Sequence, residues 1–134
     1  MEHAYEFDLL SFSETNGTVT VFEEGTIPFP VRRVFLVGAN SGQVRGAHAH
    51  RECQQLLVAV SGEITVSTTD GKTETIHHLT SSTPGLVIPA MIWATQEYIG
   101  SNATLLVICD QLFDESEYIR DFAEFTSLVG QSIT

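Results

Sequence analysis

The chain has 134 residues, enough for one domain with a buried core, and its 43% hydrophobic and 17% charged residues are typical of a folded globule rather than a disordered segment. The formal net charge of −11 disfavours nucleic acids and anionic membranes as partners. No run approaches the roughly 20 apolar residues of a membrane-spanning helix, and the first ten residues lack the pattern of a signal peptide, so we expect a cytoplasmic protein.

Short runs of strand-forming residues, separated by turn signals, predict a β-rich body. The run TVTVFE at residues 18–23 alternates polar and apolar side chains, as a half-buried strand does. Ser61-Gly62 marks a turn, and Asp70-Gly71 has the composition of a tight hairpin. Further strands are predicted at residues 31–37, 55–79 (two or three strands), 85–99 and 103–113, with Asn102 near the turn between the last two.

Residues 114–128 have a different pattern. Acidic residues come first, as at a helix N-terminus, and apolar residues then recur at helical spacing at Tyr118, Ile119, Phe122 and Phe125. We therefore expect one short C-terminal helix laid on an all-β body. Numerous short strands of similar spacing predict a closed barrel or a jelly roll. We find no internal repeat or linker, so residues 1–134 are expected to form a single domain.

Basic residues and cysteines are few, and only the arginines are clustered. Four of the six basic residues fall between positions 32 and 51 of an otherwise acidic chain. Such a cluster could hold a small anion such as a phosphate, or it could balance nearby carboxylates. Cys53 and Cys109 lie in strand-like runs without metal-binding or redox spacing, so we expect reduced thiols in the core.

Two histidines two positions apart are the strongest chemical signal. In a strand, His48 and His50 point to the same face, with Arg45 just before them. Imidazoles accept and donate protons near neutral pH, so the pair could act as a base and as a proton carrier or orienting partner. The alternative is two buried, hydrogen-bonded core histidines. His77 and His78 are adjacent, face opposite sides of a strand, and are expected to be structural or exposed.

The spacing around this pair matches the first cupin motif, in which His-x-His and an acid lie between two glycines. Both glycines and both histidines are present, whereas Gln55 stands in the place of the acid. In the second motif, Ala94 occupies the position of the third histidine. A cupin metal centre uses three imidazoles and one carboxylate. We therefore expect a cupin-type jelly-roll barrel that binds no metal ion.

The run RGAHAHRECQQLLVAVSGEITV resembles the WxcM-like, or sugar 3,4-ketoisomerase, family. Members of that family characteristically carry Arg-Gly-x-His-Ala-His, followed by a Gln-x-Leu strand and a Ser-Gly turn. Three further runs agree, IPFPVRRVFLV, GLVIPAMIW and DESEYIRDFAEF, the last of which resembles the family's Tyr-Ile-Arg-Asp-Tyr-x-x-Phe ending. The likeness spans residues 19–125, nearly the whole chain.

The resemblance implies a reaction on a dTDP-linked 4-keto-6-deoxyhexose. One base removes the proton at C3, an enediol forms, and the proton returns at C4 to leave a 3-keto sugar, with no metal or redox cofactor. By the match, His48 and His50 would handle the proton, and Arg45 would lie near the developing negative charge or the substrate. The product would serve deoxysugar biosynthesis for surface glycans.

The resemblance also implies how the substrate is held. Arg32 and Arg33 would be candidates for binding the pyrophosphate, Trp93 for lining the sugar or base pocket, and Gln55 for a further substrate contact. Because family members are homodimers that exchange N-terminal strands, we expect a homodimer of the same kind.

Some positions depart from the family's pattern: Asn16, Leu36, Gly38 and Ala94. Members commonly have an arginine at the first of these positions, tyrosines at the second and third, and a histidine or arginine at the fourth. These departures leave a second interpretation open, a non-catalytic cupin that binds a nucleotide sugar or related ligand. A third is a metal-dependent cupin dioxygenase or an epimerase-like enzyme. The intact His-Ala-His run and the arginine before it favour the isomerase.

Overall fold

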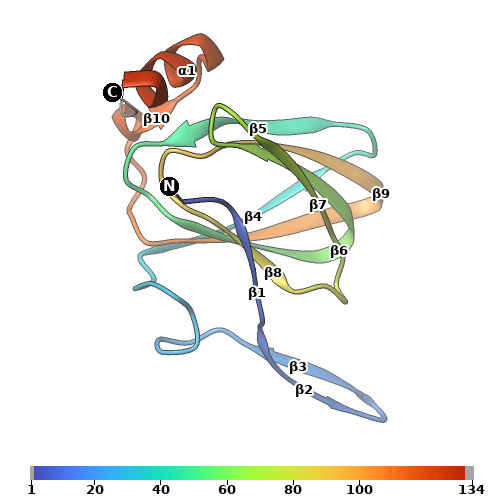
Figure 1. Ribbon diagram of the computed structural model, residues 1–134. Helices are drawn as coiled ribbons and strands as arrows, with labels where there is room; N and C mark the ends of the chain where they lie inside the picture. Colours follow the sequence, from blue (N-terminus) through green and yellow to red (C-terminus); the bar gives the residue numbers. More distant parts are fainter. Residues whose placement is uncertain (1, 132–134) are drawn as a thin grey trace.

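The computed structural model describes residues 2–131, in which strands form the body and helical segments come at the end (Figure 1). Two helical segments follow the last long strand: η1 (Glu115–Glu117) and α1 (Phe122–Gln131). The strands in chain order are β1 (Tyr5–Phe7), β2 (Leu10–Glu14), β3 (Gly17–Val21), β4 (Arg33–Ala39), β5 (Val44–His50), β6 (Gln55–Thr69), β7 (Glu74–Leu79), β8 (Gly85–Ile88), β9 (Trp93–Cys109) and β10 (Tyr118–Ile119).

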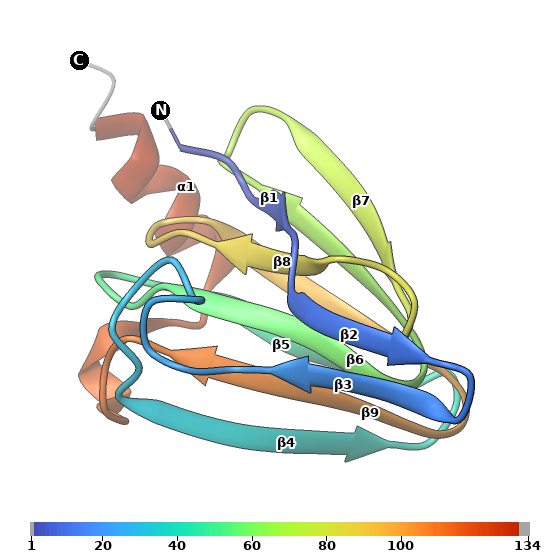
Figure 2. The same cartoon turned by 90° about the horizontal axis from the view of Figure 1, so that it is seen from below.

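The two longest strands, β6 and β9, form the centre of the main sheet. They pair antiparallel along their lengths, from Gln55 opposite Cys109 to Thr69 opposite Trp93. The eight-stranded sheet has the order β1-β8-β6-β9-β5-β10, with β4 paired to β9 and β7 to β6. Because long twisted strands curl a sheet, this one folds back on itself (Figures 1 and 2). The expected all-β jelly roll with a short C-terminal helix is confirmed.

A bulge replaces the turn predicted at Ser61-Gly62. β6 continues through both residues, and its register with β9 shifts there. Gly62 has a φ of 69°, and a Cβ at this position would lie 2.7 Å from the Cα of Ala103. Only glycine fits such a bulge, because β6 here lies too close to its paired strand β9 to leave room for a side chain.

Two other boundaries differ from the prediction. The run at residues 85–99 is divided into β8 and β9 by a turn in which Met91 has a φ of 62°. The backbone N–H of Met91 donates a hydrogen bond to the carbonyl of His50 (2.7 Å), so this turn is tied to the end of β5. β9 instead continues through Asn102, where a turn was expected, and this residue bends the strand with a φ of 60°.

The C-terminal segment is only partly helical, so the continuous helix predicted over residues 114–128 is wrong at its beginning. Residues 118–119 pair with β5 as the short strand β10. α1 begins later because Asp121 accepts a hydrogen bond from the backbone N–H of Ala123 (2.9 Å) and caps its first turn. The helix covers one end of the barrel (Figure 1), where Phe125 is buried 5.8 Å from Trp93, between ring centroids.

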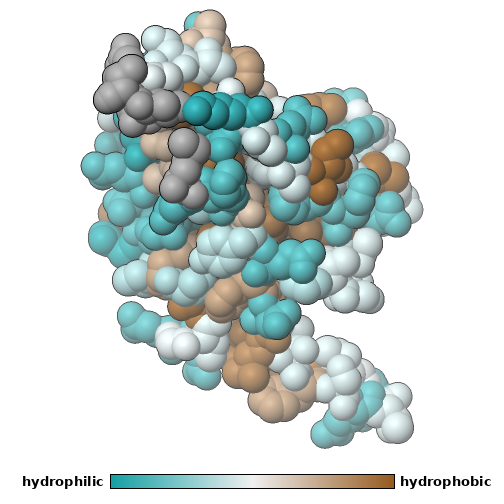
Figure 3. Space-filling view, in the orientation of Figure 1, coloured by the Kyte–Doolittle hydropathy of each residue, from teal (hydrophilic) through white to brown (hydrophobic). Residues whose placement is uncertain are grey.

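The hairpin of β2 and β3 projects from the barrel as a separate two-stranded sheet (Figures 1 and 3). Its apolar side chains are open to solvent, with Phe12 59% and Val19 62% exposed. The prediction of a half-buried strand at residues 18–23 is therefore wrong for β3, whose first four residues are exposed. A hairpin of this kind has little stability of its own and needs a surface to pack on.

The barrel interior is filled by aliphatic side chains of β6, β8 and β9, including Leu57, Ile64 and Leu105. Cys53 and Cys109 lie in the same core as free thiols, which confirms their predicted place. Within residues 2–131, the structure has no helix of the length and apolar character required to cross a bilayer.

Candidate active site

A cavity of ≈ 230 Å³ lies in the barrel between β4, β5, β9 and β10, and we call it the His48 cavity. Its apolar wall is formed by Phe35, Val37 and Val107, and its polar lining includes Arg45, His48, Gln55, Gln96, Tyr118 and Arg120. Two larger hollows, of ≈ 500 and ≈ 530 Å³, lie at the root of the β2–β3 hairpin and beside residues 111–117, and neither has a histidine in its described lining. The His48 cavity is the smallest of these three hollows, but it is the one lined by a side chain that can accept and donate a proton near neutral pH.

A bulge in β5 sets the direction of the first histidine. The register with β9 shifts between Arg45 and His48, at Gly46, whose φ is 70°. A Cβ on Gly46 would lie 2.8 Å from Nε2 of Gln96, so the absence of a side chain lets the Gln96 side chain pack directly against β5. Beyond the bulge, His48 stands opposite Ala94 across the sheet. A methyl group thus faces His48 where a metal-binding cupin would place its third imidazole.

The two histidines meet each other and a tyrosine from β10. The ring centroids of His48 and His50 are 4.9 Å apart, with the planes at 89°. Tyr118 pairs with His50 in the sheet register, and its ring lies 4.4 Å from His50 and 5.0 Å from His48. His48 lines the cavity, whereas His50 is 5% exposed and lies behind it. The prediction that both imidazoles share one face is therefore realised as a compact group of three rings.

Burial keeps both imidazoles neutral at pH 7. The pKa of His48 is lowered from 6.5 to about 4 by burial, and also by the nearby His50 and Arg120. The pKa of His50 is lowered to about 4 by burial, with contributions from Arg33 and Arg120. Neutral imidazole is the form that accepts a proton, so each ring can act as a base throughout the physiological pH range.

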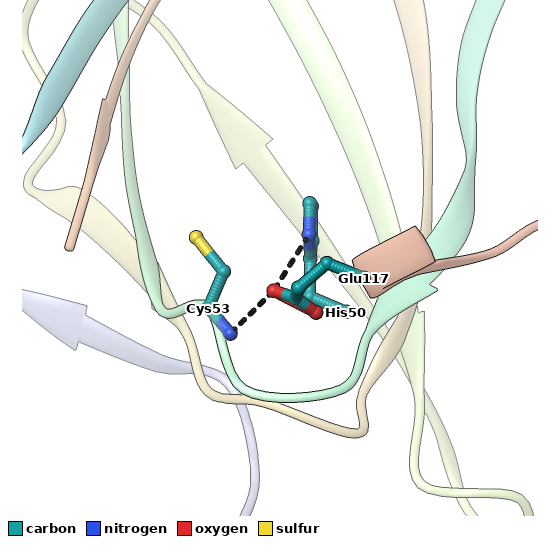
Figure 4. A group of neighbouring side chains, drawn as sticks. All are labelled: His50, Cys53 and Glu117. Atoms are coloured by element: carbon teal, nitrogen blue, oxygen red, sulfur yellow. Dashed lines mark hydrogen bonds and ion pairs between the residues drawn. The ribbon is translucent and has the colours of Figure 1, made fainter. Parts of the chain in front are cut away.

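A carboxylate faces the buried histidine from η1. Oε1 of Glu117 lies 3.5 Å from Nδ1 of His50 (Figure 4), and neither ring nitrogen of His50 has a hydrogen-bond partner among residues 2–131. The same carboxylate accepts the backbone N–H groups of Arg51, Glu52 and Cys53, the last at 2.7 Å. These three bonds hold the carboxylate firmly against the turn that follows β5.

His50, Cys53 and Glu117 are also a group that could hold a metal ion, since one potential ligand atom from each lies within 4.8 Å of the others. Zinc bonds of about 2.0–2.3 Å to nitrogen and sulfur place tetrahedral ligands about 3.5 Å apart, so the group is wider than a zinc site. The Glu117 carboxylate is also already committed to three backbone N–H groups. This donor set differs from the three imidazoles and one carboxylate of a cupin metal centre.

Arg33 is outside the cavity lining but contacts Tyr118, which lines the cavity. Its Nη2 is 3.3 Å from the Tyr118 hydroxyl and 3.5 Å from Sγ of Cys109, and its guanidinium lies over the Phe35 ring. Gln55, which lines the cavity, donates from Nε2 to the same sulfur at 3.5 Å. The pKa of the Cys109 thiol is lowered to about 6, by the neighbouring Cys53 thiol and then by Arg33 and Gln55, against the effect of burial.

Not every predicted site residue comes to the cavity. Arg45, His48 and Gln55 line it, and Arg33 contacts the lining residue Tyr118 without lining the cavity itself. Arg32 borders the separate hollow beside residues 111–117. Trp93 is 8% exposed and lies in a core cluster with Phe125, outside the cavity lining.

The departures from the family's pattern lie mostly away from the cavity. Leu36 and Gly38 alternate with Phe35 and Val37 along β4 and are exposed on the outer face of that strand. Asn16 lies in the exposed turn of the β2–β3 hairpin. Of the departures, only Ala94 stands directly beside a histidine of the pair.

Sequence reasoning missed Glu117, Tyr118 and Arg120 as site residues. All belong to the run DESEYIRDF, whose pattern predicts the start of a helix. Arg120 lies over the Tyr118 ring at 4.5 Å and lines the cavity. The signal that could have found these residues is the family-like Tyr-Ile-Arg-Asp ending, because a helix requires neither a tyrosine nor an arginine at these positions.

Known proteins that resemble this chain include sugar 3,4-ketoisomerases. A curated TDP-4-oxo-6-deoxy-alpha-D-glucose-3,4-oxoisomerase from Aneurinibacillus thermoaerophilus is 29% identical over 122 residues, covering 88% of this chain and 86% of the relative. A 3,4-ketoisomerase from Helicobacter canadensis is 28% identical with a TM-score of 0.89, covering 95% of this chain and 97% of that one. A TDP-fucose-3,4-ketoisomerase from Campylobacter jejuni is 26% identical with a TM-score of 0.90, covering 99% and 100%.

The family comparison covers almost the whole chain. The model of the FdtA family, described as WxcM-like, C-terminal, matches residues 3–130. This range includes the hairpin, the barrel and nearly all of α1, as well as every residue of the His48 cavity. The chain therefore belongs to the FdtA, or WxcM-like C-terminal, family.

Proposed function

We propose that the protein is a 3,4-ketoisomerase that moves the keto group of a dTDP-linked 4-keto-6-deoxyhexose from C4 to C3, without a metal ion, in deoxysugar biosynthesis for surface glycans. The observation that carries this proposal is a pair of neutral imidazoles in ring contact, one of which lines a cavity with Arg45 and Tyr118. Relatives named as ketoisomerases of TDP-linked sugars support the substrate class.

The proposed reaction uses the His pair for one proton. A neutral imidazole removes the hydrogen at C3, which a 4-keto group makes acidic, and the electron pair moves into a C3–C4 double bond while O4 becomes an oxyanion. O4 takes a proton as O3 gives one up, and the C3–O3 bond becomes a carbonyl when the imidazolium returns its proton to C4. Arg45, which lines the cavity, is suited to stabilise the oxyanion.

Charge favours the His48 cavity over the hollow beside Arg32 as the place for the diphosphate. The hollow beside Arg32 is also lined by four carboxylates, from Glu52, Asp114, Glu115 and Glu117, which would repel a dianion. Arg45 and Arg120 line the His48 cavity, and no carboxylate of the described residues is part of its lining. We therefore place the diphosphate at the His48 cavity rather than beside Arg32, keep Gln55 as a sugar contact, and interpret Trp93 as a packing residue under α1.

We also propose that the protein is a homodimer in which the β2–β3 hairpins are exchanged. Within the described residues, β2 and β3 pair only with each other, and their apolar side chains are exposed. A second copy offers a surface of the same chain on which Phe12 and Val19 could be buried. Such an exchange would explain why a marginally stable hairpin extends away from the barrel.

The test is turnover of TDP-4-keto-6-deoxyglucose, followed by NMR of the sugar product. The unaltered protein is expected to form the 3-keto sugar, and His48→Asn and His50→Asn to lower kcat at least ~100-fold while the fold is retained. The matched control is His78→Asn, which changes an exposed histidine and should retain full activity. Binding of TDP by the unaltered protein without turnover of any 4-keto sugar would instead establish the non-catalytic alternative.

A further inference from the structure

Glu117 is held more firmly than a surface carboxylate needs to be. Its two oxygens accept three successive backbone N–H groups, those of residues 51–53, and its side chain is only 14% exposed. This arrangement joins η1 to the turn after β5 and leaves Oε1 directed at the edge of His50 (Figure 4). The carboxylate therefore has a fixed position from which it can act on the imidazole.

We propose that Glu117 is a positioning residue that keeps the proton of neutral His50 on Nδ1, so that Nε2 is the nitrogen that accepts a proton during isomerisation. The second half of this statement rests on the proposed function, and the first half does not. Glu117 is not part of the His48 cavity lining and would act on the reaction only through His50.

Hydrogen-bond chemistry supports the assignment. A neutral imidazole carries one N–H, and an ionised carboxylate only accepts hydrogen bonds, so the nitrogen nearest Glu117 should be the one that bears the hydrogen. Within residues 2–131 no other partner competes, because both ring nitrogens of His50 lack a hydrogen bond and are enclosed. The Cys53 thiol donates to the carbonyl of Gln54 (3.3 Å) and is occupied elsewhere.

The observed distance is consistent with this role. At 3.5 Å, the Nδ1–Oε1 separation is about 0.5 Å longer than an ordinary N–H···O bond. Bonds of this kind in active sites are often long without substrate and shorten in the complex. The carboxylate is fixed by its three backbone donors, so the His50 ring, which no hydrogen bond restrains, is the partner that would have to move to close this gap.

The substitution Glu117→Gln gives a directional test. Two backbone N–H groups bind Oε2 and one binds Oε1, so the amide oxygen should take the Oε2 position and its NH₂ the Oε1 position. That NH₂ would donate to Nδ1 of His50 and force its hydrogen onto Nε2. The matched control is Asp110→Asn, which alters another carboxylate that accepts a backbone N–H of the same turn, that of Gln54 (2.8 Å), and does not face His50.

The experiment is ¹⁵N NMR of the histidine side chains at pH 7, without substrate. We expect the unaltered protein and Asp110→Asn to show His50 with hydrogen on Nδ1, and Glu117→Gln to show it on Nε2. With substrate, Glu117→Gln should lower kcat about 100-fold and change KM less than about threefold, since the loss lies in proton transfer. A purely structural role for Glu117 would leave the tautomer of a folded variant unchanged.

Two results would overturn the proposal. One is hydrogen on Nε2 of His50 in the unaltered protein, a measurement that remains decisive even if Glu117→Gln fails to fold. The other is a folded Glu117→Gln with the original tautomer. Because the NMR measurement needs no substrate, an unaltered protein that shows the Nδ1–H form but turns over no keto sugar would refute the proposed function and leave the Glu117 assignment standing.

Discussion

Lowering the pH from 7 to 5 should destabilise the protein through its two buried histidines. Both have a pKa lowered to about 4 in the folded state, against 6.5 for an unperturbed histidine. Between these values the unfolded chain binds more protons, so stability rises with pH through the window from 4 to 6.5 and is lost as the pH falls. Integration from pH 7 to pH 5 gives a loss of about 2 kcal/mol for one such histidine.

The His50→Asn variant isolates one of these contributions. His50 is the more deeply buried ring, so its share should approach the full value of about 2 kcal/mol, whereas partial solvent contact reduces that of His48. The assay is urea unfolding at pH 7 and pH 5, followed by the fluorescence of Trp93, the chain's single tryptophan. Between these pH values, the free energy of unfolding should fall by about 2 kcal/mol less in His50→Asn than in the unaltered protein. In the control His78→Asn, which changes an exposed histidine, it should fall by the same amount as in the unaltered protein. Equal losses in His50→Asn and the unaltered protein would refute the reasoning.

Gly46→Ala should lower the free energy of unfolding by about 1–3 kcal/mol, because Gly46 has a φ of 70° and a Cβ there would lie 2.8 Å from Gln96. In the control Gly38→Ala the added Cβ meets nothing within 4 Å, so the free energy of unfolding should change little. Equal unfolding midpoints for the two variants would contradict the bulge argument. Phe12→Glu should convert the proposed dimer to a monomer in light scattering, because the exchanged hairpin would bury the charge. Ile76→Glu, at another exposed apolar side chain on β7, should leave the dimer intact, and a monomeric unaltered protein would remove the hairpin proposal.

The common face of the histidine pair could be predicted because it depends on local periodicity. Residues two apart in a strand share a face, and the cupin spacing by itself indicates that both imidazoles lie in a barrel. The absence of a third imidazole was predictable for the same reason, since Ala94 occupies a position that spacing alone identifies. That Ala94 lies opposite His48 in the β5–β9 pair could be known only from the sheet register in the structure.

Glu117 and Tyr118 could not be placed by the same reasoning. Their run has apolar residues at helical spacing, and a pattern of this kind does not show which residues leave the helix to pair with a distant strand. β10 exists because β5 offers partners some 70 positions earlier in the chain, with Tyr118 opposite His50. The bulge at Gly62 was likewise predicted as a turn, because a glycine indicates a bend in the chain. Whether the chain reverses at that bend or continues as a bulged strand depends on the pairing with β9, which the sequence does not show.

The central claim is that the His48–His50 pair moves a hydrogen from C3 to C4 of a keto sugar through an enediol. The most direct measurement is turnover of TDP-4-keto-6-deoxyglucose in D₂O, with deuterium followed at C3 and C4 by NMR. The account predicts that the unaltered protein removes the C3 hydrogen and forms the 3-keto sugar, with that hydrogen at C4 where the imidazolium returns its own proton and deuterium at C4 where this proton first exchanges with the solvent. A His48→Asn/His50→Asn double variant should leave the C3 hydrogen in place. A folded double variant that isomerises the sugar at the rate of the unaltered protein would contradict the claim.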